Sequence, residues 1–131
     1  MSETNHVIVI GAGAAGMLAA IAAAREGAAV ELWEQNEKPG KKLFITGIGR
    51  CYVSNACDIE DLLGSVVSNS KFLYSSFYGF TNQDMMDLLE QAGLRLKVER
   101  GNRVFPQSDK SSDVISALSA LLRQAGVRVC L

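Results

Sequence analysis

The chain has 131 residues, of which 48% are hydrophobic and 21% charged, and its formal net charge at pH 7 is -1. This length suits one hydrophobic core, and the balanced charge argues against a nucleic-acid partner. One His and three Cys without a CxxC pair argue against a metal site and a disulfide framework. We therefore expect a cytoplasmic protein.

Residues 7–24, VIVIGAGAAGMLAAIAAA, form an apolar run that could be mistaken for a membrane span. Three glycines and many Ala residues make it a poor one, because Ala inserts weakly. The residues before it include Glu3 and lack the cationic region of a secretory signal. The sequence therefore predicts no membrane partner.

The first three expected elements are a strand, a helix and a strand. His6–Ile10 is apolar and rich in β-branched residues, which indicates a buried strand. Ala14–Arg25 consists mostly of strong helix formers, and Gly27 stands where a C-terminal cap belongs. Ala29–Trp33 predicts the second strand. The expected fold class is α/β, with a Rossmann-like βαβ unit of parallel strands.

The turn between this strand and helix reads GAGAAG and matches GxGxxG in the setting that dinucleotide binding requires. The first glycine is expected to make a tight turn, the second to admit a pyrophosphate, and the third to let the helix close on the strand. The helix N-terminus offers free N–H groups to the phosphates. A plain tight turn is the alternative. The predicted cofactor-binding residues here are Gly11, Gly13, Ala14, Ala15 and Gly16.

Glu34 follows the second strand, about 20 residues after the glycines. A carboxylate at this place accepts hydrogen bonds from ribose hydroxyls and would repel the 2′-phosphate of NADP. We assign Glu34 and the adjacent Gln35 to the cofactor site. The agreement of strand, helix and carboxylate favours a dinucleotide site over a plain turn.

Residues 37–56 show almost no helix or strand signature and predict a long irregular loop. A loop of this length inside a compact domain is usually functional. Its length favours FAD over NAD, because a dehydrogenase usually passes quickly from its second strand to a helix. Phe72, Phe77 and Phe80 recur at helical spacing and predict core packing.

The remaining elements follow from capping, alternation and turn signals. Thr81 and Asp84 form a capping-box pattern that begins a helix, which Gly93 ends. Residues 94–99 and 103–105 flank a Gly-Asn turn and predict an antiparallel pair. A later helix reaches Gln124, residues 127–131 form a last strand, and the caps expected for this helix are Asp109 with Ser111 or Ser112.

Two segments carry a family resemblance: HVIVIGAGAAGMLAAIAAAREGAAVELWEQNEKPGKKLFITGIGRC, residues 6–51, and RVFPQSDKSSDVISAL, residues 103–118. They resemble the BaiN-like NAD(P)/FAD-dependent oxidoreductases, the aminoacetone oxidase family. This resemblance implies a glutathione-reductase-like FAD fold that is incomplete at the C-terminus. Residues 1–131 would be the N-terminal part of an FAD/NAD(P)-binding domain, with the substrate domain absent.

The resemblance also implies that the loop of residues 37–56, called the basic loop from here on, wraps the cofactor. Backbone N–H groups at its glycines would approach the pyrophosphate, and its cations would pair with phosphate. The alternatives are a solvated lysine pair and a Cys that merely packs. Ile48 and Tyr52 depart from the family pattern, in which the first position is commonly Gly or Asn and the second is Asn. The cofactor-binding residues implied are Lys41, Lys42, Thr46, Gly47, Gly49, Arg50 and Cys51.

The function implied is that of an FAD-binding segment of a flavoprotein oxidoreductase. Reduced nicotinamide, NAD(P)H, would donate hydride to the flavin, which passes it to a small organic substrate or to oxygen. One alternative is a non-catalytic truncated remnant, or a half-domain that self-associates or needs a complementing chain. Another is a small NAD-binding dehydrogenase module. No residue stands out as catalytic.

Overall fold

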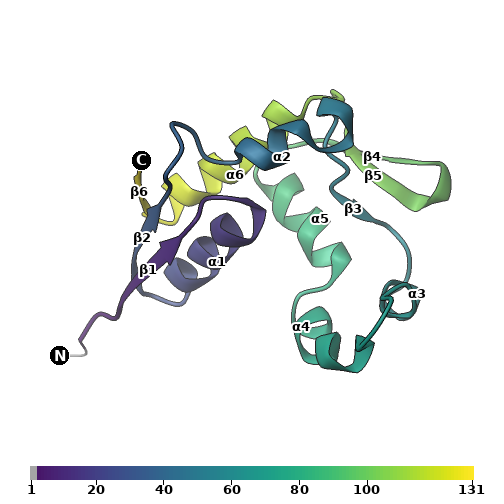
Figure 1. The fold of residues 1–131 in the computed structure, drawn as a ribbon, viewed down its shortest axis with the longest axis horizontal. Helices are drawn as coiled ribbons and strands as arrows, with labels where there is room; N and C mark the ends of the chain where they lie inside the picture. Colours follow the sequence, from purple (N-terminus) through teal and green to yellow (C-terminus); the bar gives the residue numbers. More distant parts are fainter. Residues whose placement is uncertain (1–2) are drawn as a thin grey trace.

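The computed structural model describes residues 3–131 (Figure 1). Its first sheet is parallel, with strands in the order β1-β2-β6, and contains β1 (His6–Ile10), β2 (Ala29–Trp33) and β6 (Arg128–Cys130). The α/β class and the βαβ unit expected from the sequence are confirmed. In the described residues, no helix is long and apolar enough to cross a membrane.

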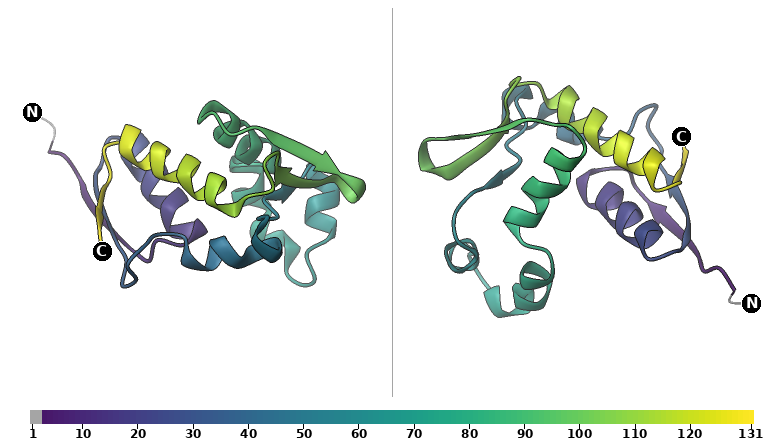
Figure 2. Two further views of the ribbon diagram at one scale, coloured as in Figure 1. Left: turned by 90° about the horizontal axis from the view of Figure 1, so that it is seen from above. Right: turned by 180° about the vertical axis from the view of Figure 1, so that it is seen from behind.

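Helices α1 (Ala14–Arg25) and α6 (Ser111–Gln124) cover one side of this sheet. Figures 1 and 2 show both helices on the same side, with α6 in yellow beside the purple α1. Val30 and Leu32 of β2 point into the core because strand side chains alternate between faces. The largest core side chains are Met17, Leu32, Leu89, Leu118 and Leu122.

The other face of the parallel sheet is open. Ile8, Ile10 and Trp33 are 54%, 84% and 46% exposed. Parallel sheets are usually covered on both faces. This sheet therefore presents an apolar surface that its own two helices do not reach.

The second sheet is antiparallel, with strands in the order β3-β5-β4. It contains β3 (Ser54–Asn55), β4 (Leu96–Glu99) and β5 (Arg103–Pro106), and the single helical turn η3 (Arg100–Asn102) joins β4 to β5. The predicted hairpin is confirmed. Strand β3 was not predicted, because two residues are too few to show an alternating pattern.

Helix α5 (Asn82–Gln91) begins with the predicted capping box. The Thr81 hydroxyl accepts from the Asp84 N–H at 3.1 Å, and the Asp84 carboxylate accepts from the Thr81 N–H at 2.9 Å. Before it come three short helices: α3 (Ile59–Gly64), η2 (Ser70–Leu73) and α4 (Tyr74–Gly79). Figure 1 places α3 and α4 away from the parallel sheet.

The core role predicted for the aromatic residues before α5 is wrong for two of the three. Phe72 is 85% exposed and Phe80 is 47% exposed, while Phe77 is half-buried. Residues 70–79 divide into the two short helices η2 and α4, so helical spacing does not gather these rings on one buried face.

The loop expected to be irregular contains two short helical segments, so that expectation is wrong in part. Helix α2 (Lys41–Ile45) packs beside α6, and the 3-10 segment η1 (Thr46–Gly49) follows it. A five-residue helix has too few turns to show a periodic pattern, and contact with α6 stabilises it. The Ser111 hydroxyl donates to the carbonyl of Phe44 at 2.6 Å, which ties the two helices together.

The same contact corrects the expected start of α6. The N-cap is Lys110, and Ser111 is already the first helical residue. No side chain forms the cap hydrogen bond, because the Ser111 hydroxyl is used by Phe44 and the Asp109 carboxylate by cations. The caps predicted at Asp109, Ser111 and Ser112 are therefore wrong.

Candidate functional site

The glycine turn brings strand β1 and helix α1 into backbone contact. Gly11 has φ +100°, a conformation that favours glycine. A Cβ atom on Gly16 would lie 1.7 Å from the carbonyl oxygen of Gly11, which no side chain can tolerate. The steric roles predicted for Gly11 and Gly16 are therefore confirmed by the structure.

The N-terminus of α1 carries free N–H groups. Its N-cap is Gly13, no side chain forms a cap hydrogen bond, and its first turn contains no acidic residue. Ala14 and Ala15 are exposed, and a Cβ on Gly13 would meet no atom within 4 Å. An α-helix leaves its first N–H groups without intrahelical partners, and here no side chain caps them. This arrangement can bind an anion.

The Glu34 carboxylate is held against the glycine turn from two sides. Its Oε2 accepts from the backbone N–H of Ala12 at 2.7 Å. Its Oε1 accepts from the backbone N–H and the side-chain Nδ2 of Asn36, at 3.0 and 2.9 Å. These hydrogen bonds, those of the Asn36 and Ala12 N–H groups above all, hold the pKa of Glu34 below its usual range. The carboxylate is therefore charged and oriented at neutral pH.

The basic loop begins directly on the glycine turn. The Gly40 N–H donates to the Ala12 carbonyl at 2.7 Å. Gly40 has φ +71°, and a Cβ there would lie 3.0 Å from the side chain of Ile115 in α6. Only glycine suits both the conformation and the space, so Gly40 lets the loop pass between the turn and α6.

The middle of this loop has an unusual backbone. Gly47, Ile48 and Gly49 have φ values of 58°, 56° and 80°. Ile48 is wholly exposed, at 100%. A β-branched residue is strained in the left-handed region and gains nothing here from burial. This strain lies at a position where the sequence resemblance leads us to expect Gly or Asn.

The polar groups of the loop differ in what they contact. Lys41 and Lys42 are exposed, and Lys41 forms a 3.5 Å ion pair with Glu37. Both observations agree with the alternative of a lysine pair that faces solvent. The Thr46 hydroxyl donates to the Leu43 carbonyl at 2.7 Å. Cys51 is 1% exposed, and burial raises the pKa of its thiol, so a packing role fits it best.

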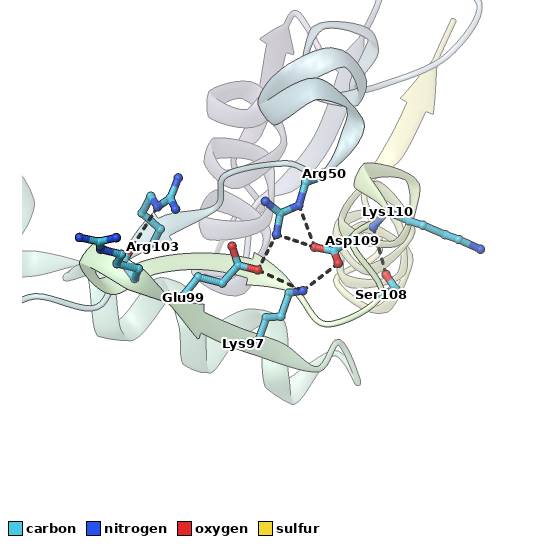
Figure 3. A network of polar contacts seen from close by, with 8 residues as sticks. Arg50, Lys97, Glu99, Arg103, Ser108, Asp109 and Lys110 are labelled. Carbon is cyan, nitrogen blue, oxygen red and sulfur yellow. Dashed lines mark hydrogen bonds and ion pairs between the residues drawn. The ribbon is translucent and has the colours of Figure 1, made fainter.

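Arg50 lies in an ion network with the second sheet (Figure 3). Its guanidinium donates to Asp109 Oδ1 from Nε at 2.9 Å and to Glu99 Oε2 from Nη2 at 2.6 Å. Lys97 Nζ bridges the same two carboxylates, at 2.7 Å from Asp109 and 3.2 Å from Glu99. The Arg50 guanidinium also lies 3.9 Å from the centre of the Phe105 ring. The network fastens the loop to the β4–β5 hairpin.

The network shifts the pKa of all four members. Hydrogen bonds from Lys97 and Arg50 lower the pKa of Asp109, and those from Arg50 and Lys97 lower that of Glu99. Hydrogen bonds to Asp109 and Glu99 raise the pKa of both cations. Asp109 and Glu99 occupy Nε and Nη2 of Arg50, so within the described residues Nη1 is the guanidinium nitrogen left to meet a phosphate.

The structure therefore gathers some predicted site residues and separates others. The glycine turn, Glu34 and the start of the basic loop lie together, whereas Arg50 is drawn to the second sheet. Sequence reasoning missed Asn36 and the network partners Lys97 and Glu99. The alternation of Lys97 and Glu99 on one strand was a usable signal, because it places both on one face. Asn36 offered no comparable signal.

Comparison with known proteins shows that residues 5–131 match the family described as HI0933-like protein Rossmann domain. A 3-dehydro-bile acid delta(4,6)-reductase of Clostridium scindens is 36% identical over 129 residues, which are 95% of this chain and 30% of that protein. A ribosomal RNA dihydrouridine synthase of Escherichia coli is 39% identical over 93 residues, 70% of this chain and 22% of that protein. The chain thus spans less than a third of the length of these relatives.

A solved structure supports the fold. The crystal structure of Thermovibrio ammonificans THI4 matches with a TM-score of 0.61 and 15% identity, over 97% of this chain and 37% of that one. At this identity the match shows the Rossmann-like fold alone.

Proposed function

This chain belongs to the HI0933-like, or BaiN, family of FAD-binding Rossmann domains, and we propose that it is the FAD-binding segment of a flavoprotein oxidoreductase. Residues 1–131 would then form the N-terminal part of an FAD/NAD(P)-binding domain, with the residues that select a substrate outside it. In the whole enzyme, bound flavin would carry hydride from NAD(P)H to an acceptor.

One observation carries this proposal: a charged carboxylate and open helix N–H groups meet at the same glycine turn. Glu34 accepts from Ala12 at 2.7 Å, beside the uncapped N-terminus of α1. The adenosine ribose of FAD would donate to the carboxylate, and its pyrophosphate would lie over Gly13, where no atom stands within 4 Å of a Cβ position. The donor and acceptor types present therefore fit the AMP half and pyrophosphate of FAD.

The names of the relatives indicate what kind of molecule accepts the hydride in the whole enzyme. The Clostridium scindens protein is named as a reductase of a bile acid derivative, and the Escherichia coli protein as a synthase of dihydrouridine in ribosomal RNA. Both names describe a reduced organic product, which supports an organic acceptor rather than oxygen. A steroid and an RNA differ widely, so the substrate class is not assigned to this segment.

The remaining predicted contacts are part of the proposal. Backbone N–H groups at Gly47 and Gly49 would approach the cofactor, and Lys41, Lys42 and Thr46 would lie near its phosphates or ribityl chain. Gln35 is exposed beside Glu34, where it could meet the ribose. Arg50 would offer its Nη1 towards the flavin end, because Asp109 and Glu99 hold Nε and Nη2, and Cys51 would pack beneath the loop.

The test is a titration of the purified 131-residue chain with FAD, followed by flavin fluorescence and visible absorption. Saturable binding near one FAD per chain is expected, and NAD should compete weakly. A chain that binds NAD more tightly than FAD would instead support a small NAD-binding dehydrogenase module. A chain that binds neither nucleotide would defeat the proposal.

Two variants of strand β2 and its end make this test specific. Glu34→Gln should weaken FAD binding about tenfold, because the ribose hydroxyl loses a charged acceptor. Glu31→Gln removes a carboxylate that faces the open side of the sheet and pairs with Arg128, so it should leave FAD binding unchanged. Equal losses in both variants would count against a specific site at Glu34.

A half-domain that associates is the second candidate function, favoured by the open sheet face. Ile8, Ile10 and Trp33 expose apolar surface that a second polypeptide could cover. Analytical ultracentrifugation would show a stable dimer or larger species, and Ile10→Asp should return the chain to a monomer. A wild-type chain that is monomeric at high concentration would reject this candidate.

A further inference from the structure

We propose that Asn36 is a positioning residue for cofactor recognition: it occupies Glu34 Oε1, so that Oε2 is left to accept the adenosine ribose hydroxyl. This inference rests on the proposed function, because it concerns how Glu34 meets the ribose of a bound dinucleotide. It adds a residue that the glycine fingerprint does not contain.

The geometry divides the two carboxylate oxygens unequally. Oε1 accepts twice from Asn36, from its backbone N–H at 3.0 Å and its Nδ2 at 2.9 Å. Oε2 accepts once, from the Ala12 N–H at 2.7 Å. A carboxylate offers about four acceptor positions, two on each oxygen. The position that remains is therefore on Oε2, the oxygen that lies at the glycine turn.

The Asn36 side chain adds something that its backbone cannot. With the backbone N–H alone, Oε1 would keep a free acceptor position and could accept a hydroxyl in place of Oε2. The second bond from Nδ2 fills that position and directs acceptance to Oε2. The hydrogen bonds of Asn36 and Ala12 also keep the pKa of Glu34 low, which preserves the charged acceptor.

The experiment measures discrimination between ligands that differ by one hydroxyl. ADP, 2′-deoxy-ADP and 3′-deoxy-ADP compete with FAD for the wild-type chain, and the preference for ADP is expected to be about tenfold against at least one deoxy compound. In Asn36→Ala and in the isosteric Asn36→Asp, this ratio should fall towards one. Asn36→Asp should have the larger effect, because its carboxylate cannot donate and repels Glu34. Asn5→Ala, an exposed site near the N-terminus, is the control.

The outcomes separate the inference from its premise. General structural damage would weaken ADP and deoxy-ADP equally and leave the ratio intact, which would overturn the role of Asn36. A wild-type chain that binds FAD without preferring ADP over either deoxy compound would overturn the inference and leave FAD binding standing. A wild-type chain that binds neither FAD nor ADP would defeat the proposed function, and the inference with it.

Discussion

The glycine turn and the basic loop are both expected to meet the cofactor, yet the fold treats their polar groups in different ways. At the turn, the first N–H groups of α1 are uncapped, and the adjacent Gly13 is exposed. In the loop, Arg50 is engaged by Asp109 and Glu99, and the Thr46 hydroxyl by Leu43. The donors of the turn are therefore available to a ligand, while the Arg50 and Thr46 side chains of the loop already form hydrogen bonds within the protein.

The difference has a general physical cause. The first N–H groups of a helix cannot be satisfied by that helix, so they stay available unless a side chain caps them. A long cationic side chain can reach any carboxylate that the fold brings near. Backbone donors at a turn thus predict a ligand site more reliably than basic residues in a loop.

The largest effect is expected at Gly16, where the glycine turn depends on backbone contact. Gly16→Ala would force a methyl group against the Gly11 carbonyl and should cost at least about 3 kcal/mol in the free energy of unfolding. Urea unfolding measures this cost. Gly64→Ala, where a Cβ meets no atom within 4 Å, is the matched control and should not destabilise the chain. Equal stability of the two variants would contradict the packing role.

Gly13 separates ligand binding from folding at the same turn. Gly13 has φ −82°, and a Cβ there would meet no atom within 4 Å, so Gly13→Ala should lower the free energy of unfolding by no more than about 1 kcal/mol, the cost of Ala at an N-cap. The same methyl group would stand where the pyrophosphate approaches, and FAD affinity should fall at least about tenfold. Urea unfolding measures the change in stability, and calorimetric titration measures the change in FAD affinity. An unchanged FAD affinity would remove Gly13 from the site.

Ile48 tests whether the loop carries strain. Ile48→Asn should stabilise the chain by about 1 kcal/mol, because Asn tolerates φ near +56° and no burial is lost. Val67 is another fully exposed β-branched residue, and its φ is not positive. Val67→Asn should therefore leave the free energy of unfolding nearly unchanged. A gain of equal size in both variants would point to a general effect of replacing exposed apolar side chains instead of strain.

Asp109 tests the ion network with the smallest expected change. Asp109→Asn keeps a residue that accepts φ +59° but removes the charge that Arg50 and Lys97 share, so the melting temperature at pH 7 should fall slightly. The folded-state pKa of Asp109 is lowered, so its contribution is present above the ordinary value of 3.8 and is lost as pH falls through the folded pKa. The melting curves of variant and wild type should therefore converge in acid.

Adding FAD to the same Asp109→Asn variant tests whether Arg50 serves the hairpin or the cofactor. If Arg50 serves the hairpin alone, FAD affinity should match that of the wild type. A clear rise in affinity would mean that the carboxylates hold Arg50 back from the cofactor, and the basic loop would then be a second contact that the network restrains.

The sequence predicted the βαβ unit well because its signals are local. The bounds of β1, α1 and β2 agree with the expected ranges, and the capping box of Thr81 and Asp84 needs only neighbours along the chain. The predictions that failed concern α2, the start of α6 and the aromatic residues before α5. Each depends on how segments pack in space, as the contact of Ser111 with Phe44 illustrates.

The fold class, the glycine turn and the carboxylate after the second strand can be predicted from residue order alone, because steric needs and alternating burial show in neighbouring residues. Which polar groups remain free depends on contacts between segments that are distant along the chain. Ala12 meets Glu34 across 22 residues, and Arg50 meets Glu99 and Asp109 across 49 and 59 residues. Hydrogen-bond partners depend on distances in space, and the order of residues does not state them.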